Sequence, residues 1–306
     1  MTKVAIIGIG HVGSTVAYTL VARQLCDELV LLDQDKDLAE AEKQDLLTGQ
    51  VGRTGAVAIT ASKPEELGSC DLIIFSAGDI TILQNSTDRF AELTYTRTTV
   101  EQWAPIIKAA NFKGVILNIT NPCDVITQYM QQLTGFSKNR VLGTGTTLDT
   151  ARMQLVVGNH FGVSPNAITG YVLGEHGNSQ FVAWSGVRVG SEDITKLSDA
   201  NTLAGFEDAA KADAWHTIKA KGYTSYGVAD QAAIVAEAIL KNSKLILPVT
   251  HYNEAVACYL GHPAIIGKAG IIASTELTLT PAEQQRWVQS ANKIKDMFGT
   301  LFVAAS

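Results

Sequence analysis

The first half of the chain carries short, continuous apolar runs, each followed by small or polar residues. The four clearest runs are Val4–Ile7, Leu29–Leu32, Asp71–Ser76 and Gly114–Thr120. A strand that helices cover on both faces of a parallel sheet has this pattern, because neither of its faces meets water. A helical pattern from about residue 14 to 23 separates the first two runs. The alternation predicts a parallel sheet flanked by helices.

The second half of the chain has a more varied pattern. We expect a strand and loop over Val141–Thr147, a helix from Leu148, antiparallel strands at Phe181–Trp184 and Val187–Val189, a hairpin from Ala264–Gly267 and Ile271–Ala273, and an amphipathic helix from Pro281 to about Phe302. This mixture predicts a second domain of α+β character.

Composition narrows the class of protein. The chain has 306 residues, of which 46% are hydrophobic and 18% charged, so it can form one large core or two ordinary ones. The net charge of −6 disfavours a nucleic-acid partner, and no apolar run approaches the length of a membrane span. Four cysteines without paired or metal-binding spacing suit a reducing compartment. We expect a cytoplasmic protein without a nucleic-acid, membrane or metal partner.

A glycine-rich turn follows the first apolar run directly. Gly8, Gly10 and Gly13 form the pattern G-x-G-x-x-G, with His11 and Val12 between the last two glycines. In a strand–turn–helix context, the first glycine allows the tight turn, the second admits a pyrophosphate to the backbone, and the third lets the helix pack against the strand. The phosphate charge then lies at the helix N-terminus. The turn predicts a dinucleotide site.

An aspartate selects between the two nicotinamide dinucleotides. Asp33 ends the second apolar run, twenty residues after Gly13. Its carboxylate can accept hydrogen bonds from the hydroxyls of the adenine ribose and would repel a phosphate on that sugar. We therefore expect NAD, and not NADP, as the cofactor.

The ends of the later strands should complete the cofactor site, because ligands of open parallel sheets bind at the carboxyl ends of the strands. We expect Ala77 and Gly78, which follow the third run, and Ile119 and Asn121, which close the fourth, to line it. Asn121 also predicts the N-cap of a helix whose first residue is Pro122. One asparagine can both cap a helix and offer its amide to a ligand.

These features together predict an α/β fold in two parts. Residues 1–143 should form an N-terminal Rossmann domain, a doubly wound parallel sheet that binds NAD. Residues 144–306 should form a C-terminal mixed α+β domain that carries the substrate site.

Three polar residues of the second half are candidates for chemistry. His176 lies between glycines in Gly174–Asn178, and its imidazole can exchange a proton near neutral pH. Asp149 and Arg152 are three residues apart, so they share one face of the predicted helix. Each has a plain structural alternative, a hydrogen-bonded loop histidine and a surface ion pair.

The motifs, taken in order, resemble those of the L-lactate/L-malate dehydrogenase family over nearly the whole chain. They are the glycine-rich turn with Asp33, Ser76-Ala77-Gly78, Asp88-Arg89-Phe90, Asn121-Pro122-Cys123-Asp124, Leu148-Asp149-Thr150-Ala151-Arg152, Gly174-Glu175-His176-Gly177-Asn178 and Lys221-Gly222-Tyr223-Thr224. Within the family, the chain looks most like the L-2-hydroxyisocaproate dehydrogenases. The resemblance implies an NAD-dependent oxidoreductase that interconverts 2-keto and 2-hydroxy acids.

The resemblance also implies catalytic and substrate-binding roles. His176 would exchange the proton, and Asp149 would fix its tautomer and stabilise the imidazolium. Arg152 would clamp the substrate carboxylate with its planar guanidinium. Arg89 would polarise the keto oxygen from a loop that closes over the substrate.

Further roles concern the surroundings of the substrate. Asn121 would hold the substrate oxygen and steady the nicotinamide, and Thr224 would line the pocket. Gln154 and Thr169 stand where fructose-bisphosphate-activated relatives carry arginine and histidine, so activation by that sugar is not expected. The family also implies a homo-oligomer, a tetramer or a dimer.

Departures from the family pattern bear on the substrate. Malate dehydrogenases carry an arginine six residues before the loop arginine, where this chain has Leu83 beside Gln84. A dicarboxylate would meet an apolar wall there, whereas a branched or aromatic side chain would fit. We expect medium-chain 2-keto acids of the 2-ketoisocaproate type as substrates. The alternatives are an L-lactate dehydrogenase and, from another class, a non-catalytic NAD-binding protein.

Overall fold

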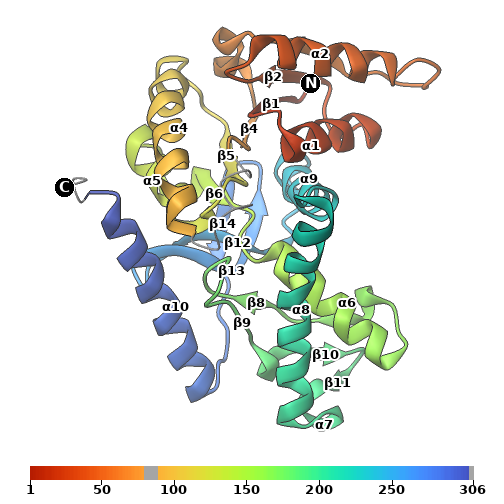
Figure 1. Cartoon of the computed structure of the whole chain (residues 1–306), viewed down its shortest axis with the longest axis vertical. Coiled ribbons are helices and arrows are strands. Elements are labelled where there is room, and N and C mark those ends of the chain that lie inside the picture. Colours follow the sequence, from red (N-terminus) through yellow and green to blue (C-terminus); the bar gives the residue numbers. More distant parts are fainter. Residues whose placement is uncertain (79–88, 303–306) are drawn as a thin grey trace.

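The computed structural model describes residues 1–78 and 89–302, apart from the side chains of residues 89–91 and 214–215. A nine-stranded sheet runs through the upper part of the molecule with helices on both faces, and a lower lobe of helices and short strands lies beneath it (Figure 1). The predicted positions Leu83 and Gln84 lie outside the described residues.

Six parallel strands form the first part of the sheet, in the order β3-β2-β1-β4-β5-β6. They are β1 (Lys3–Ile7), β2 (Glu28–Leu32), β3 (Ala58–Ala61), β4 (Leu72–Phe75), β5 (Val115–Asn118) and β6 (Val141–Gly143). The chain starts in the middle and winds outward to both edges, which is the order of a Rossmann sheet. The predicted α/β fold class is confirmed.

Three antiparallel strands extend this sheet beyond β6. They are β12 (Ile246–Asn253), β13 (Cys258–Gly267) and β14 (Gly270–Ser274), and β12 meets β6 where Thr250 pairs with Gly143. The predicted hairpin corresponds to β13 and β14. β3, β12 and the first half of β13 were not predicted from the sequence. The sequence pattern therefore did not show that one sheet contains strands from both predicted domains.

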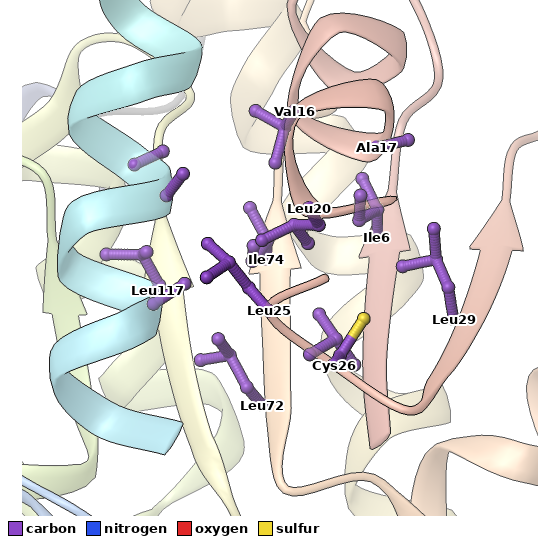
Figure 2. Packing of buried hydrophobic residues seen from close by; sticks show 14 of the residues in the cluster. Ile6, Val16, Ala17, Leu20, Leu25, Cys26, Leu29, Leu72, Ile74 and Leu117 are labelled. Atoms are coloured by element: carbon purple, nitrogen blue, oxygen red, sulfur yellow. The ribbon is translucent and has the colours of Figure 1, made fainter. Parts of the chain in front are cut away.

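The two faces of the sheet are covered by different helices. On one face lie α1 (His11–Ala22), α2 (Lys36–Thr48) and α9 (Tyr226–Leu240), and on the other α4 (Arg89–Ala109), α5 (Cys123–Thr134) and α10 (Pro281–Thr300). Figure 2 shows Val16 and Leu20 on the side of α1 that faces Ile6 and Ile74. Ile7, the neighbour of Ile6, packs in the opposite core, because successive side chains of a strand alternate between faces.

The lower lobe supplies the rest of the fold. Its helices are α6 (Thr147–Phe161), α7 (Ile194–Leu197) and α8 (Ala200–Lys221), and its strands are β7 (Ile168–Thr169), β8 (Val172–Leu173), β9 (Phe181–Val182), β10 (Arg188–Val189) and β11 (Glu192–Asp193). Short 3₁₀ turns cover Pro64–Ser69, Lys138–Arg140, Pro165–Ala167 and Trp184–Gly186. In the described part of the chain, every helix is too short or too polar to cross a membrane.

Two predictions for the lobe need correction. The strands expected at residues 181–184 and 187–189 are shorter and belong to different sheets, since β9 pairs with β8 whereas β10 pairs with β7 and β11. The chain between β7 and β8 turns at Gly170, where a φ of +116° and the close approach of Val187 admit only glycine. The 22-residue α8 was not predicted.

The N-cap prediction for Asn121 is wrong by one residue. Pro122 occupies the cap position of α5, with an extended ψ of 115°. Its carbonyl accepts the first helical hydrogen bond, from the amide of Ile126 at 2.9 Å. Asn121 therefore lies before the helix, and its amide is not used as the cap.

A buried pair of histidines joins the antiparallel strands to α10. Ser274 contacts His251 and His262 at 3.1 Å each, and Trp287 packs against His262. Burial, together with a smaller effect of the nearby His251, lowers the pKa of His262 to about 4. The fold therefore holds His262 neutral at physiological pH.

We expect this buried histidine to make the fold acid-sensitive. The unfolded chain binds a proton at this histidine more tightly than the folded chain does. The contribution of neutral His262 to the free energy of unfolding is therefore complete above pH 6.5 and is lost as the pH falls toward 4. A folded pKa of about 4 against an unfolded value of 6.5 corresponds to about 3 kcal/mol. Urea unfolding from pH 7 to 4.5 should show a steeper loss for the wild type than for His262→Asn. Equal slopes would contradict the assignment.

Candidate active site

The glycine-rich turn between β1 and α1 is tightly packed on one side and open on the other. Gly8 has a φ of +91°, and a Cβ there would lie 2.6 Å from the backbone of Ala77. A Cβ on Gly13 would lie 1.9 Å from the carbonyl oxygen of Gly8. A Cβ on Gly10 would meet no protein atom within 4 Å. The backbone at Gly10 is therefore accessible to a ligand at the N-terminus of α1, as a pyrophosphate requires.

Asp33 lies against this turn. Its carboxylate accepts a hydrogen bond from the amide of Ile9 at 2.7 Å and another from the amide of Asp35 at 3.0 Å. A carboxylate has further lone pairs and can accept ribose hydroxyls as well. The position and the charge of Asp33 fit NAD.

A cavity of about 320 Å³ follows the carboxyl ends of the strands. It is lined by Gly10, His11, Val12, Ser76, Gly78, Glu92, Ile119, Thr120, Asn121, Tyr223, Thr224 and Val228. The ring of His11 stacks on that of Tyr223 with 3.8 Å between centroids, which joins the glycine-rich turn to the loop before α9. The cavity collects most of the residues that the sequence predicted for the cofactor.

A buried carboxylate in α6 organises the polar centre of the lobe. Asp149 is 3% exposed and receives His176 Nδ1 at 2.6 Å and Arg152 Nη1 at 3.4 Å. With its amide assigned so that the nitrogen, and not the oxygen, faces this carboxylate, Gln180 donates to both oxygens at 3.1 and 3.2 Å. A carboxylate only accepts, so His176 carries a proton on Nδ1. Asp149 is buried and Arg152 is partly buried, so the pair differs from the surface ion pair considered from the sequence.

The loop that presents His176 is fixed from three directions. The carboxylate of Asp124 accepts the backbone amide of His176 at 2.7 Å. Ser290 of α10 accepts the amide of Glu175 at 2.7 Å. Gly174 exchanges backbone hydrogen bonds with Gly261 of β13 at 2.9 Å in each direction. The imidazole is therefore held by its own backbone as well as by Asp149.

Asp124 is a site residue for which the sequence suggested no role. It is 2% exposed and also accepts a hydrogen bond from Thr250 Oγ1 at 2.5 Å. Burial raises the pKa of its carboxyl to about 7, against the opposing effect of these hydrogen bonds. The residue connects α5, the His176 loop and β12. Its place in the motif Asn121-Pro122-Cys123-Asp124 was the available signal.

A second cavity, of about 250 Å³, adjoins the first. His176, Asp149, Arg152, Asn121 and Thr224 all line it. The two cavities share four residues, Ile119, Asn121, Thr224 and Val228. A ligand between His176 and Arg152 would therefore lie next to the cofactor cavity. The structure brings these five predicted residues together, whereas the side chain of Arg89, the first residue of α4, lies outside the described part.

The fold and site together define an NAD-dependent oxidoreductase acting on a 2-hydroxyacid. Residues 2–143 match the NAD-binding domain of lactate/malate dehydrogenases, and residues 146–302 match their α/β C-terminal domain. The chain belongs to the lactate/malate dehydrogenase family. The family predicted from the motifs is confirmed, and the non-catalytic alternative is set aside.

Individual relatives agree over nearly the full length. The L-lactate dehydrogenase of Bacillus velezensis is 32% identical, covering 99% of this chain and 98% of the relative. L-lactate dehydrogenase 3 of Bacillus cereus is 34% identical, covering 98% of each. The crystal structure of the minor L-lactate dehydrogenase from Enterococcus mundtii superposes with a TM-score of 0.93 at 31% identity, covering 98% of each chain.

Proposed function

We propose that this protein is an L-2-hydroxyacid dehydrogenase that reversibly reduces medium-chain branched or aromatic 2-keto acids, of the 2-ketoisocaproate type. The observation that carries the proposal is the apolar wall of the substrate cavity. Leu148, Ile218 and Val228 line the same cavity as His176 and Arg152. An apolar substrate side chain would be removed from water there, at about 25 cal/mol per Å². Leu83 in the sequence supports the same choice.

His176 is the group that exchanges the proton with the substrate oxygen. Its Nδ1 proton is directed at Asp149 across 2.6 Å, which assigns the exchanged proton to Nε2. In reduction, Nε2 donates its proton to the keto oxygen, and Asp149 stabilises the imidazolium before the transfer. In oxidation, Nε2 takes the proton from the hydroxyl. Asp124 and Ser290 keep the loop in place during both directions.

Two arginines bind the polar groups of the substrate, its carboxylate and its keto oxygen. Arg152 pairs with the carboxylate, which a planar guanidinium can bind through two parallel hydrogen bonds. Arg89, at the start of α4, polarises the keto oxygen while negative charge develops on it. Asn121, which lines both cavities, orients the oxygen next to the cofactor.

The two parts of the chain have different roles. Residues 1–143 bind NAD through Gly8, Gly10, His11, Val12 and Gly13 of the glycine-rich turn, and through Asp33, Ala77, Gly78, Ile119 and Asn121. Residues 144–306 supply the groups that bind and protonate the substrate. Bound at this site, NAD would supply the donor or acceptor of the hydride at C2 of the substrate.

L-lactate dehydrogenase is the second candidate function. The curated relatives named above carry this name, and pyruvate has the same carboxylate and keto group as larger 2-keto acids. The two candidates differ only in the side chain on C2. Oxaloacetate is the poorest expected substrate, because its second carboxylate would be desolvated without a partner beside Leu83.

A comparison of four keto acids tests the substrate class. NADH oxidation should show the highest kcat/KM with 2-ketoisocaproate or phenylpyruvate, about tenfold or more above pyruvate, and lower still with oxaloacetate. Ile218→Ala should reduce the preference for the branched acid over pyruvate. A higher kcat/KM for pyruvate would instead support L-lactate dehydrogenase.

We also propose that the protein is cytoplasmic and assembles into a homotetramer or dimer. Large apolar side chains on its surface support assembly, and these are Tyr18, Val51, Leu155 and Tyr226. Sedimentation velocity distinguishes these states from a monomer.

A further inference from the structure

The guanidinium of Arg152 faces two carboxylates. Nη1 lies 3.4 Å from Asp149 Oδ1 within α6, and Nε lies 3.7 Å from Asp213 Oδ2 on α8. Asp149 is 3% exposed and also serves His176, whereas Asp213 is 55% exposed. Asp213 thus adds a second negative charge beside the arginine that is proposed to bind an anionic substrate.

The two carboxylates lie on different sides of Arg152. Among the described residues, Arg152 is common to the substrate cavity and to two hollows of about 370 Å³ between α6 and α8. Asp149 lines the substrate cavity, and Asp213 lines both outer hollows. The attraction of Asp213 therefore pulls the guanidinium away from the space that the substrate would fill.

Among the described side chains, a second cation at this cavity, Lys211, has its own counter-ion. Lys211, two residues before Asp213 and on another face of α8, lines the substrate cavity and donates to Glu207 at 2.9 Å. Glu207 is also paired with Arg286. Lys211 thus pairs with Glu207, whereas Asp213 pairs with Arg152.

Resting on the proposed function, we propose that Asp213 lowers substrate affinity, as a counter-ion that competes with the substrate carboxylate for Arg152. Coulomb attraction to a 2-keto acid is reduced while Arg152 is shared between Asp149 and Asp213. Every 2-keto acid carries the same carboxylate. Asp213 therefore sets the KM for the whole class, while the apolar wall sets the choice among its members.

The experiment replaces Asp213 by Asn and follows binding separately from turnover. Exposed ion pairs contribute up to about 1 kcal/mol, so the KM for the best 2-keto acid should fall about threefold in Asp213→Asn. The kcat should change much less. The dissociation constant of oxamate, an unreactive 2-keto acid analogue, should fall by the same factor when measured by NADH fluorescence in the enzyme–NADH complex.

Asp208→Asn is the matched control, because it removes the same charge from an exposed position of the same helix. It should leave both constants at the wild-type values. Oxamate affinity that is unchanged or weaker in Asp213→Asn, or an equal gain in Asp208→Asn, would overturn the inference. A wild type that binds oxamate but reduces no 2-keto acid would instead overturn the proposed function, since oxamate binding reports on Arg152 without chemistry.

Discussion

Replacing His176 by glutamine is expected to lower kcat for 2-keto acid reduction by roughly a thousandfold, within the range of general acid–base catalysis. Glutamine retains a polar side chain of similar length, but it cannot donate and recover a proton. The backbone of residue 176 would still be held by Asp124, and the cofactor cavity is lined by other residues. The dissociation constant of NADH should therefore stay within about twofold of the wild type.

Steady-state kinetics and NADH fluorescence titration measure these two quantities. His216→Gln, the same substitution at an exposed histidine of α8, is the control and should retain wild-type kcat. If His176→Gln lost NADH binding together with turnover, the histidine would be structural, and its hydrogen bond to Asp149 would have been mistaken for a catalytic arrangement.

Five of the six parallel strands were predictable because they are apolar on both faces. The exception is β3, whose short sequence includes an exposed Ala58 and a partly exposed Thr60. β12 lacks that signal. Its sequence from Ile246 to Asn253 contains Pro248 and polar residues such as His251, which is buried and hydrogen-bonded. Proline inside a central strand normally argues against a strand. Only the tertiary pairing of β12 with the long β13 explains its place in the sheet.

The failure to predict helix α8 has a related cause. Its buried positions follow a helical spacing through Leu203, Phe206 and Ala210, but the intervening Glu207 is buried too. That glutamate is compensated by Arg286 from α10, a contact 79 residues away in sequence. Glu207 therefore interrupts the apolar pattern, and the local sequence does not reveal the arginine that compensates its charge. Because the helix was not predicted, Asp213 was not recognised as a neighbour of Arg152.

In the candidate site too, contacts between residues close in sequence were predictable and contacts between distant residues were not. Asp149 and Arg152 could be paired from the sequence because three residues of helix bring them to one face. The bond between Asp149 and His176 spans 27 residues, and only the family resemblance suggested it. The supports of the loop, Asp124 and Ser290, come from 52 and 115 residues away from their bonded partners. The spacing of residues along a helix or strand cannot predict contacts between residues so far apart in the sequence.

Replacing Asp149 by asparagine is expected to lower kcat on the order of a hundredfold, because the imidazolium of His176 loses its negative partner. The asparagine amide can donate to Nδ1 as well as accept from it, so it no longer enforces a proton on that nitrogen. The KM for the keto acid should change as well, since Arg152 loses a neighbour at 3.4 Å. Steady-state kinetics with the best keto acid measure both effects.

Gln180→Leu separates the charge of Asp149 from its packing. This variant removes the amide that donates to both oxygens of Asp149 but keeps the carboxylate beside His176. If the negative charge is what matters, kcat of Gln180→Leu should fall by only about tenfold, the lower end of the net worth of a hydrogen bond to a charged group. Equal losses in the two variants would mean that Asp149 acts only by holding the local packing. A kcat of Asp149→Asn above half the wild-type value would refute the assigned role of the carboxylate, because the proton on His176 would then be stabilised without it.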